Sequence, residues 1–396
     1  MITPYQKADV SFRKIKKLDE QGCFSEVYLA HDENLDHDLV IKEITKKPNQ
    51  DKDTYFSEAR LLYKNAHPNI VQVQYAAEDN EKIYIAMPYY INGTISQKMS
   101  RGNFTPREII RYAIQFIGGL YHIHTKKLIH FDIKPNNIMI SNRNEAMLAD
   151  FGLSKLININ STAVPDYNYY FHTPPEYFTI SKNGGFTYTF DIYQVGMTLY
   201  RMCIGAIDFE DEISQFQSAD QLESAIKAGT FPSRQYPLHI PKKLISIINK
   251  CLESNPNDRF QSSLDILNAL SSIKDDDGAL DWRKCDNSDA ALNEWRKETA
   301  GAILHLSYDC NKKSSICYRV YPDGRKRKEG KGTLSSCSQS KIYQILKGLW
   351  LWKSWRCWIM RHPAEGMLRW PPLIQNQIFW MKMKKRNALI NSDLHL

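Results

Sequence analysis

The most constraining part of this sequence is the segment His130–Asn137, which reads HFDIKPNN and is followed by the tripeptide Asp150–Gly152 (DFG). Asp132 in the first segment and Asp150 in the second are eighteen residues apart. Carboxylate and amide oxygens are the ligands that Mg²⁺ prefers, and a carboxylate can also orient or deprotonate an attacking hydroxyl. The two segments together predict one active site that contains residues from both.

Two further charged residues precede these segments. Lys42 lies in LVIK, a predicted strand, and Glu58 lies in FSEARLL, a predicted helix. In this order and spacing, the four features resemble the eukaryotic-type protein kinase family. The resemblance covers roughly residues 10–275, about two thirds of the chain.

The resemblance implies transfer of the γ-phosphoryl group of Mg-ATP to a protein hydroxyl, with autophosphorylation also expected. The implied catalytic residues are Asp132, Lys134, Lys42 and Glu58, and the implied metal ligands are Asn137 and Asp150. Asp132 would act as the base or orient the acceptor hydroxyl, and Lys134 would contact the γ-phosphate. Lys42 would bind the ATP phosphates while Glu58 holds it in place.

The nucleotide-binding loop departs from the family pattern. The pattern G-x-G-x-x-G maps onto residues Glu20–Ser25, where only Gly22 remains. The glycines normally allow backbone N–H groups to approach the phosphates closely, and Glu20 adds a negative charge there. Val27, which would cover the adenine, is retained. We therefore expect weakened nucleotide affinity rather than loss of binding.

The connection between the two predicted lobes fits an adenine site. The implied adenine-binding residues are Val40, Met87, Pro88, Tyr90 and Met139. Met87 is at the gatekeeper position, and Pro88, which has no N–H, would contribute only its carbonyl. Tyr90 would offer its backbone N–H to the ring. Val40 and Met139 would sandwich the adenine, although both positions are equally suited to an ordinary core.

Several scaffold positions also match the family. Asp191, in FDIYQVGMTLY, matches the buried aspartate that holds the catalytic loop from below. Glu176 matches the end of the activation segment, and its implied ion-pair partner is Arg259. Small-molecule phosphotransferases lack this segment and this pair, which favours a protein substrate. The implied hydrophobic spine between the lobes comprises Leu62, Val73, His130 and Phe151.

The residue before the catalytic aspartate is Phe131, where many family members have arginine. That arginine pairs with a phosphate on the activation loop. Because Phe131 cannot do so, the sequence predicts that activity is constitutive or controlled in another way.

The acceptor class is indicated by the D-x-K-P-x-N pattern. Lys134 in this pattern resembles serine/threonine kinases, but Tyr169 replaces a threonine expected before Glu176. We favour serine/threonine specificity, with tyrosine or dual specificity as the alternative. A second alternative is a pseudokinase-like scaffold that acts through its basic C-terminal region.

The predicted fold is α+β and two-lobed, with residues 10–274 as the kinase domain. An N-lobe (10–88) would hold a small antiparallel sheet and one helix, and a C-lobe (91–274) would be mainly helical. The predicted strands are Phe12–Leu18, Glu26–Ala30, Asp38–Ile44, Ile70–Tyr75 and Lys82–Met87, and the predicted helix is Thr54–Asn65. Thr105, Pro106 and Glu108 predict a capping box at the start of a helix that runs to about His124.

Residues 275–396 form a basic α+β extension in this interpretation. They contain 22 Lys and Arg against 13 Asp and Glu, whereas residues 1–274 are almost neutral. Ile303–Tyr308 and Ser315–Tyr321 predict a hairpin, and Gln339–Leu349 predicts a helix, within an accessory domain at 290–349. A Trp-rich tail would follow at 350–396.

The basic region could contact an acidic protein, nucleic acid or a membrane surface. Its charge run Arg325–Lys328 is equally typical of a solvated face, and the Trp-rich tail could also pack on the kinase domain.

The compartment is predicted from the cysteines and the N-terminus. Eight cysteines lack any C-x-x-C pair, which argues against a zinc site and favours reduced thiols. The N-terminus has no apolar signal region, and no run of about eighteen apolar residues is present. We therefore expect a cytoplasmic protein without a transmembrane segment.

Overall fold

The computed structural model describes residues 10–19, 25–46, 56–158, 162–165, 169–179, 185–274, 279–287, 289 and 291–348. The side chains of Glu58 and Leu62 lie outside this description, although the helix that carries them is within it. Gly22 and the predicted Trp-rich tail lie outside the described residues altogether.

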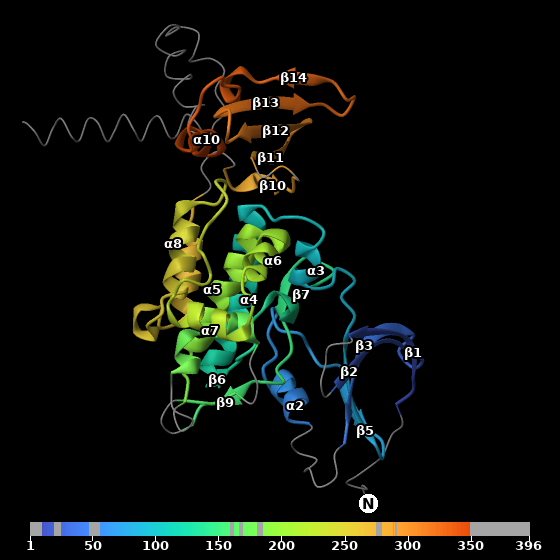
Figure 1. The fold of residues 1–396 in the computed structure, drawn as a ribbon. Helices are drawn as coiled ribbons and strands as arrows, with labels where there is room; N and C mark the ends of the chain where they lie inside the picture. Colours follow the sequence, from blue (N-terminus) through green and yellow to red (C-terminus); the bar gives the residue numbers. More distant parts are fainter. Residues whose placement is uncertain are drawn as a thin grey trace, which may run out of the picture.

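The N-lobe is a five-stranded antiparallel sheet with one described helix (Figure 1). The strand order is β1-β2-β3-β5-β4. The bounds are β1 Phe12–Asp19, β2 Ser25–Asp32, β3 His37–Thr45, α2 Ser57–Lys64, β4 Tyr75–Glu78 and β5 Lys82–Pro88. The predicted sheet and its inserted helix are confirmed.

The strand predicted at Ile70–Tyr75 is wrong in position, because β4 begins only at Tyr75. Ile70 forms an isolated bridge with Leu148, and the backbone N–H of Val71 donates to the Leu148 carbonyl at 2.9 Å. Ile70 and Val71 are buried. This apolar run is therefore tied to a C-lobe strand instead of entering the N-lobe sheet.

The C-lobe is mainly helical and surrounds the long helices α4 and α5 (Figure 1). Its helices are α3 Ile95–Met99, α4 Pro106–Thr125, α5 Thr189–Ile204, α6 Ala206–Ser214, α7 Ala219–Lys227, α8 Lys242–Cys251 and α9 Ser263–Ser271. Its short strands are β6 Leu128–Ile129, β7 Ile138–Ile140, β8 Ala146–Leu148 and β9 Lys155–Leu156. Its 3₁₀ turns are η1 Pro135–Asn137, η2 Tyr170–His172, η3 Pro175–Phe178 and η4 Pro256–Asp258.

Local sequence explains how α4 begins. Thr105 accepts a hydrogen bond from the backbone of Glu108, and the Glu108 side chain accepts one from the Thr105 backbone. Pro106 occupies the first turn, where its missing N–H costs nothing. The predicted capping box is thus confirmed. Helix α5, in contrast, is apolar nearly all round, and every residue in it except Arg201 is buried, as expected of a central core helix.

Between residues 279 and 348, the described part of the C-terminal region folds into a five-stranded antiparallel sheet with one helix, α10 (Figure 1). The strands follow chain order: β10 Arg283–Cys285, β11 Leu292–Thr299, β12 Ala302–Asp309, β13 Ser314–Val320 and β14 Lys326–Lys328. Short turns η5 Ala279–Asp281 and η6 Gly330–Gly332 flank them, and α10 spans Gln339–Leu346. The predicted hairpin is confirmed as β12 paired with β13. β10, β11 and β14 were not predicted, and β14 lies within the charge run at the edge of the sheet.

This C-terminal module docks on the C-lobe. Trp295 is almost fully buried, and its indole N–H donates to Nδ1 of His239 at 3.2 Å. Arg283 forms an ion pair with Glu108 at 3.0 Å, next to the α4 cap. Leu238 packs against the apolar core of the module. The module and the C-lobe therefore share a buried interface.

Within the described parts of the chain, no helix combines the length and the apolar character needed to cross a membrane.

Candidate active site

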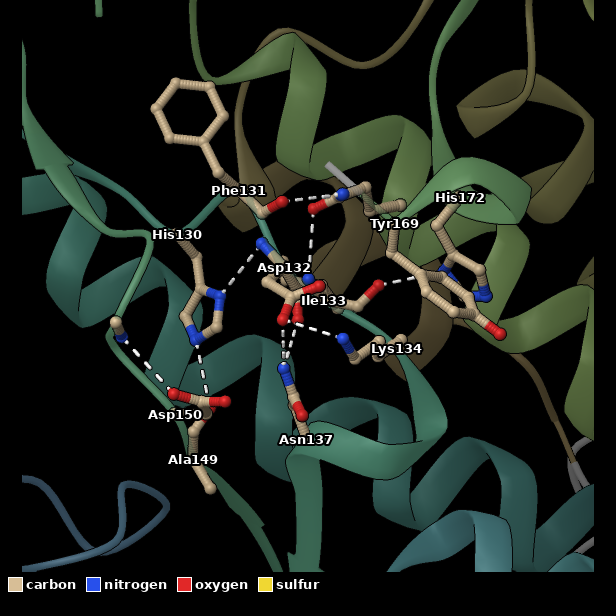
Figure 2. Close-up of polar contacts among 12 residues, drawn as sticks. His130, Phe131, Asp132, Ile133, Lys134, Asn137, Ala149, Asp150, Tyr169 and His172 are labelled. Atoms are coloured by element: carbon tan, nitrogen blue, oxygen red, sulfur yellow. Dashed lines mark hydrogen bonds and ion pairs between the residues drawn. The ribbon is translucent and has the colours of Figure 1, made fainter. Parts of the chain in front are cut away.

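Two residues of the HFDIKPNN segment, Lys134 and Asn137, converge on the carboxylate of Asp132 (Figure 2). Oδ2 of Asp132 accepts hydrogen bonds from Lys134 Nζ at 2.8 Å and from Asn137 Nδ2 at 2.7 Å. Asn137 Nδ2 also donates to the Asp132 backbone carbonyl at 2.9 Å. This arrangement fixes the rotation of the Asp132 side chain.

The second oxygen of Asp132 is the unusual one. Oδ1 is buried and has no hydrogen-bond partner among the described residues. A buried carboxylate oxygen without a partner costs of order 1–3 kcal/mol or more. An acceptor hydroxyl that donates to Oδ1 would remove this cost.

Lys42 on β3 reaches across to the DFG segment. Its Nζ lies 3.2 Å from Oδ1 of Asp150, and the backbone N–H of Gly152 also donates to that oxygen at 3.3 Å. The charge of Lys42 lowers the pKa of Asp150 to about 2, so the carboxylate is ionised at neutral pH. The predicted contact between Lys42 and Glu58 lies outside the described side chains.

The catalytic loop is held from below by Asp191. Its Oδ2 accepts from the backbone N–H of His130 and its Oδ1 from that of Phe131, both at 2.8 Å. Phe131 has φ of 67°, a left-handed conformation that residues with a Cβ rarely adopt. Two charge-assisted hydrogen bonds to a buried carboxylate stabilise this turn. His124 Nε2 lies 2.8 Å from Asp191 and orients it in turn.

Sequence reasoning missed Gln194, which completes this support. Gln194 Oε1 accepts from the backbone N–H of Ile133 at 3.0 Å, and its Nε2 donates to the Phe131 carbonyl at 2.9 Å. Gln194 is three residues after Asp191 on the same helix, so both face one side of α5. That spacing was a usable signal, because a glutamine in a buried helix must find partners.

His130 and Phe151 lie against each other between the two segments. Their ring centroids are 5.0 Å apart in an edge-to-face arrangement, and His130 Nε2 lies 3.2 Å from the Ala149 carbonyl. Burial lowers the pKa of His130. Val73 packs against the apolar core of the C-lobe, to which Phe151 also belongs. The side chain of Leu62 lies outside the description.

Phe131 points away from Asp132 into an apolar cluster (Figure 2). Its ring makes edge-to-face contacts with Phe190 at 5.0 Å and Phe186 at 6.5 Å between centroids. Ala163 in the activation segment belongs to the same cluster and pairs with Phe186 through two backbone hydrogen bonds. The activation segment is therefore joined to the catalytic loop by apolar packing at this point.

The far end of the activation segment is held by an ion pair. Arg259 donates from both terminal nitrogens to the two carboxylate oxygens of Glu176, each at 2.7 Å. Arg259 also donates to the carbonyls of Glu253 and Thr189. A bidentate pair with its remaining donors satisfied avoids the cost of an unpaired buried charge.

The sheet register places four of the implied nucleotide-binding residues on one face. Val27 pairs with Lys42, and Val40 pairs with Met87 on the neighbouring strand. Directly opposed residues, and residues two apart on a strand, point to the same face. Since Lys42 reaches Asp150, this face is turned toward the C-lobe. Pro88 ends β5, Tyr90 follows it, and burial raises the pKa of Tyr90. Met139 lies on β7.

The donor set fits Mg²⁺ with ATP. Asn137 uses its amide nitrogen to bind Asp132, so its carbonyl oxygen is the atom left to face a ligand. Asp150 is ionised and about half exposed. Amide and carboxylate oxygens of this kind suit a hard cation that also binds phosphates.

The comparisons with known proteins agree with this geometry. A sequence profile of the protein kinase domain matches residues 12–270. The chain is 32% identical over 246 residues to serine/threonine-protein kinase Nek5 of Homo sapiens, covering 60% of this chain and 33% of that protein. It is 26% identical over 254 residues to serine/threonine-protein kinase PrkC of Bacillus subtilis, covering 62% of this chain and 38% of that protein.

A third relative is the probable serine/threonine-protein kinase CA_C1728 of Clostridium acetobutylicum, at 27% identity over 268 residues. Those residues span 65% of this chain and 40% of that protein. The chain belongs to the protein kinase family, and its two lobes form the protein kinase fold. It matches only about a third to two fifths of the length of these relatives.

Proposed function

We propose that this chain transfers the γ-phosphoryl group of Mg-ATP to serine or threonine hydroxyls of proteins, including its own. The observation that carries the proposal is the Asp132 carboxylate, whose Oδ2 is held by Lys134 and Asn137 while Oδ1 is buried without a partner. Phosphoryl transfer depends mainly on positioning and on neutralising charge, and this arrangement provides a positioned acceptor for a hydroxyl proton.

Each residue has a defined part in this proposal. Oδ1 of Asp132 accepts the hydrogen bond of the attacking hydroxyl and orients its oxygen toward the phosphorus. Lys134 and Lys42 place positive charge near the transferring group and the other phosphates. Asn137 and Asp150 would hold Mg²⁺, which neutralises phosphate charge when bound. Asp191 and Gln194 keep the loop backbone in place.

Serine/threonine specificity is supported by the names of the relatives and by Lys134 in the D-x-K-P-x-N pattern. Tyrosine or dual specificity is the alternative, because Tyr169 replaces the threonine of the pattern. The pseudokinase-like scaffold is a weaker alternative. It is favoured only by the poor glycine loop, which lies outside the described residues.

The test is autophosphorylation of the purified chain with labelled Mg-ATP, beside an Asp132→Asn variant. Asparagine keeps the shape of the side chain but removes its charge and its capacity as a base. We expect label in the wild type, a fall of at least 100-fold in the variant, and phosphoserine or phosphothreonine on hydrolysis. Equal label in both proteins, or no label in either with generic substrates, would reject the proposal.

We also propose that activity does not require phosphorylation of the activation segment. The apolar cluster that Phe131 shares with Ala163 of the activation segment supports this, because it joins loop and segment without a phosphate. The test replaces the segment hydroxyls in one variant: Ser161→Ala, Thr162→Ala, Tyr167→Phe, Tyr169→Phe and Tyr170→Phe. We expect at least a third of wild-type activity on an added substrate, and abolished activity would contradict the proposal.

Cytoplasmic location and the partner of the basic C-terminal region stay predictions. The module surface carries the exposed strand β14, Lys326–Lys328, at its free edge. Lysines at a sheet edge also prevent edge-to-edge association, so this strand by itself does not favour one partner.

A further inference from the structure

Tyr169 lies directly beside Lys134 and Asp132 (Figure 2). Lys134 Nζ is 4.7 Å from the centroid of the Tyr169 ring. The same Nζ donates to Oδ2 of Asp132 at 2.8 Å. The ammonium group is therefore placed between a carboxylate and the face of an aromatic ring.

The Tyr169 ring is itself held by its neighbours on the activation segment. It contacts Phe171 edge to face at 5.7 Å and lies tilted against His172 at 5.5 Å between centroids. Burial lowers the pKa of Arg201, and this effect is opposed by the Tyr169 side chain, which accepts a hydrogen bond from Arg201. The Tyr169 side chain therefore interacts with two neighbouring rings and with Arg201.

His172 connects this ring to the catalytic loop. His172 Nδ1 lies 2.9 Å from the carbonyl of Ile133, the residue between Asp132 and Lys134. Because a carbonyl only accepts, Nδ1 carries the proton, and Nε2 accepts from Arg201 at 3.0 Å. Burial, together with the charge of Arg201, lowers the pKa of His172 well below its usual value. A neutral His172 thus holds the loop backbone and supports the ring.

We propose that Tyr169 is a positioning residue that holds the Lys134 ammonium against Asp132 through a cation–π contact. The inference rests on the proposed function, in which Lys134 acts on the γ-phosphoryl group. A cation over a ring face is attracted by the ring quadrupole, so the ring covers one side of the ammonium. A threonine at this position has a hydroxyl but no ring face.

The competing explanation is that Tyr169 only fills space. Two substitutions separate the explanations. Tyr169→Phe keeps the ring face and removes the hydroxyl, whereas Tyr169→Leu keeps apolar bulk and removes the ring. Tyr169→Met serves as a second variant without a ring if the leucine protein does not fold. Thermal unfolding of each variant shows whether the fold is intact.

The first measurement is the rate of reductive methylation of Lys134, followed by peptide mass spectrometry. Lys312, whose side chain is 80% exposed, is the internal reference. The Lys134 side chain is only 19% exposed in the presence of the ring. We expect the normalised rate to rise at least threefold in Tyr169→Leu and to change less than 1.5-fold in Tyr169→Phe. Equal rates in the leucine, methionine and wild-type proteins would overturn the proposal.

The second measurement is steady-state phosphorylation of a generic protein substrate at saturating Mg-ATP. We expect kcat to fall about tenfold in Tyr169→Leu, to stay within twofold in Tyr169→Phe, and the KM for ATP to stay within threefold in both. Equal losses of kcat in Tyr169→Phe and Tyr169→Leu would overturn the proposal, because the ring would then not matter.

The two measurements also separate this proposal from the proposed function. If the wild type is as inactive as Asp132→Asn, the proposed function fails. The methylation rates then still decide whether the ring covers Lys134, because they need no turnover.

Discussion

The catalytic loop is held by two opposite kinds of interaction. On its polar side, Asp191 and Gln194 of α5 make four hydrogen bonds to the backbone of residues 130–133. On its aromatic side, Phe131 has no exposed surface and packs against Phe186 and Phe190, in a cluster that also contains Ala163 of the activation segment. Hydrogen bonds fix the position and direction of backbone groups, whereas apolar packing holds two segments together without a charge or a phosphate.

The shape of the catalytic loop and its attachment to neighbouring segments therefore depend on different interactions. The polar side determines the shape of the loop, including the left-handed Phe131. The aromatic side determines what lies against the loop. The aromatic contact needs no modification of the segment to form. The first three predictions below test this division in order of decreasing effect, and the fourth concerns the ion pair between Lys42 and Asp150.

Removing the polar support should lower the free energy of unfolding more than any other change. Asp191→Ala leaves the backbone N–H groups of His130 and Phe131 buried without acceptors, and His124 loses its partner. We expect a loss of about 3–5 kcal/mol in the free energy of unfolding, measured by urea denaturation. Asp265→Ala, at an exposed position in the first turn of α9, is the control and should cost less than about 0.5 kcal/mol. A loss below about 1 kcal/mol in Asp191→Ala would refute the importance of the polar side.

Removing the aromatic contact should lower the free energy of unfolding slightly less than Asp191→Ala does. Phe131→Ala leaves a cavity between Phe186 and Phe190, and we expect about 3 kcal/mol of destabilisation. Phe131→Leu keeps most of the volume and should cost about 1 kcal/mol. Urea denaturation measures both, and limited proteolysis of the activation segment reports its attachment. If the segment is cleaved no faster in Phe131→Ala than in the wild type, the aromatic side does not hold it.

A third contact of the loop, between His172 of the activation segment and the Ile133 carbonyl, should be sensitive to pH. Burial keeps the pKa of His172 well below 6.5 in the folded protein, so the unfolded chain binds more protons below pH 6.5. Stability is therefore lost as pH falls below about 6.5, by at most about 2 kcal/mol between pH 7 and 5, which is the limit for one histidine that stays neutral in the folded state. Urea denaturation of His172→Gln should show a smaller loss over this range. The cost of Phe131→Leu should be the same at both pH values, and a cost that changes would contradict the apolar assignment.

The ion pair between Lys42 and Asp150 should make the smallest contribution to the free energy of unfolding. Lys42 holds the pKa of Asp150 at about 2, below its ordinary value of 3.8. This contribution is present above about pH 4 and is lost as pH falls toward 2. Because Asp150 is about half exposed, solvent screening should limit it to less than about 1 kcal/mol. Urea denaturation between pH 4 and 2 should show a shallower decline for Lys42→Met than for the wild type, and identical declines would show that the pair has no energetic role.

Much of the fold was predictable because its signals are local. The alternation of β12 and β13, the capping box at Thr105 and the strand that carries Lys42 all depend on residues close in sequence. The strand predicted at Ile70–Tyr75 was misplaced for the opposite reason. Its apolar residues looked like strand, but they are buried against Leu148 of the C-lobe, more than seventy residues later.

The candidate site shows the same division. Asp132, Lys134, Asn137 and Asp150 were predicted by their residue types and spacing, and the structure brings them together. Gln194, His172 and Arg201 were not predicted from the sequence. A polar residue in a helix or turn does not by itself indicate which distant residue it will contact. Gln194 and Phe131, for example, are 63 residues apart.

Residue types and their spacing are enough to identify the chemical groups of this protein and the short elements that carry them. The carboxylate of Asp132, the ammonium of Lys134 and the amide of Asn137 lie within six consecutive residues, so the chain itself keeps them close together. Other contacts form only when distant elements pack together: Phe131 joins an aromatic cluster, Tyr169 lies against Lys134, and Trp295 docks on His239. These contacts depend on how separate elements pack, and packing chooses partners by shape and burial rather than by position in the chain.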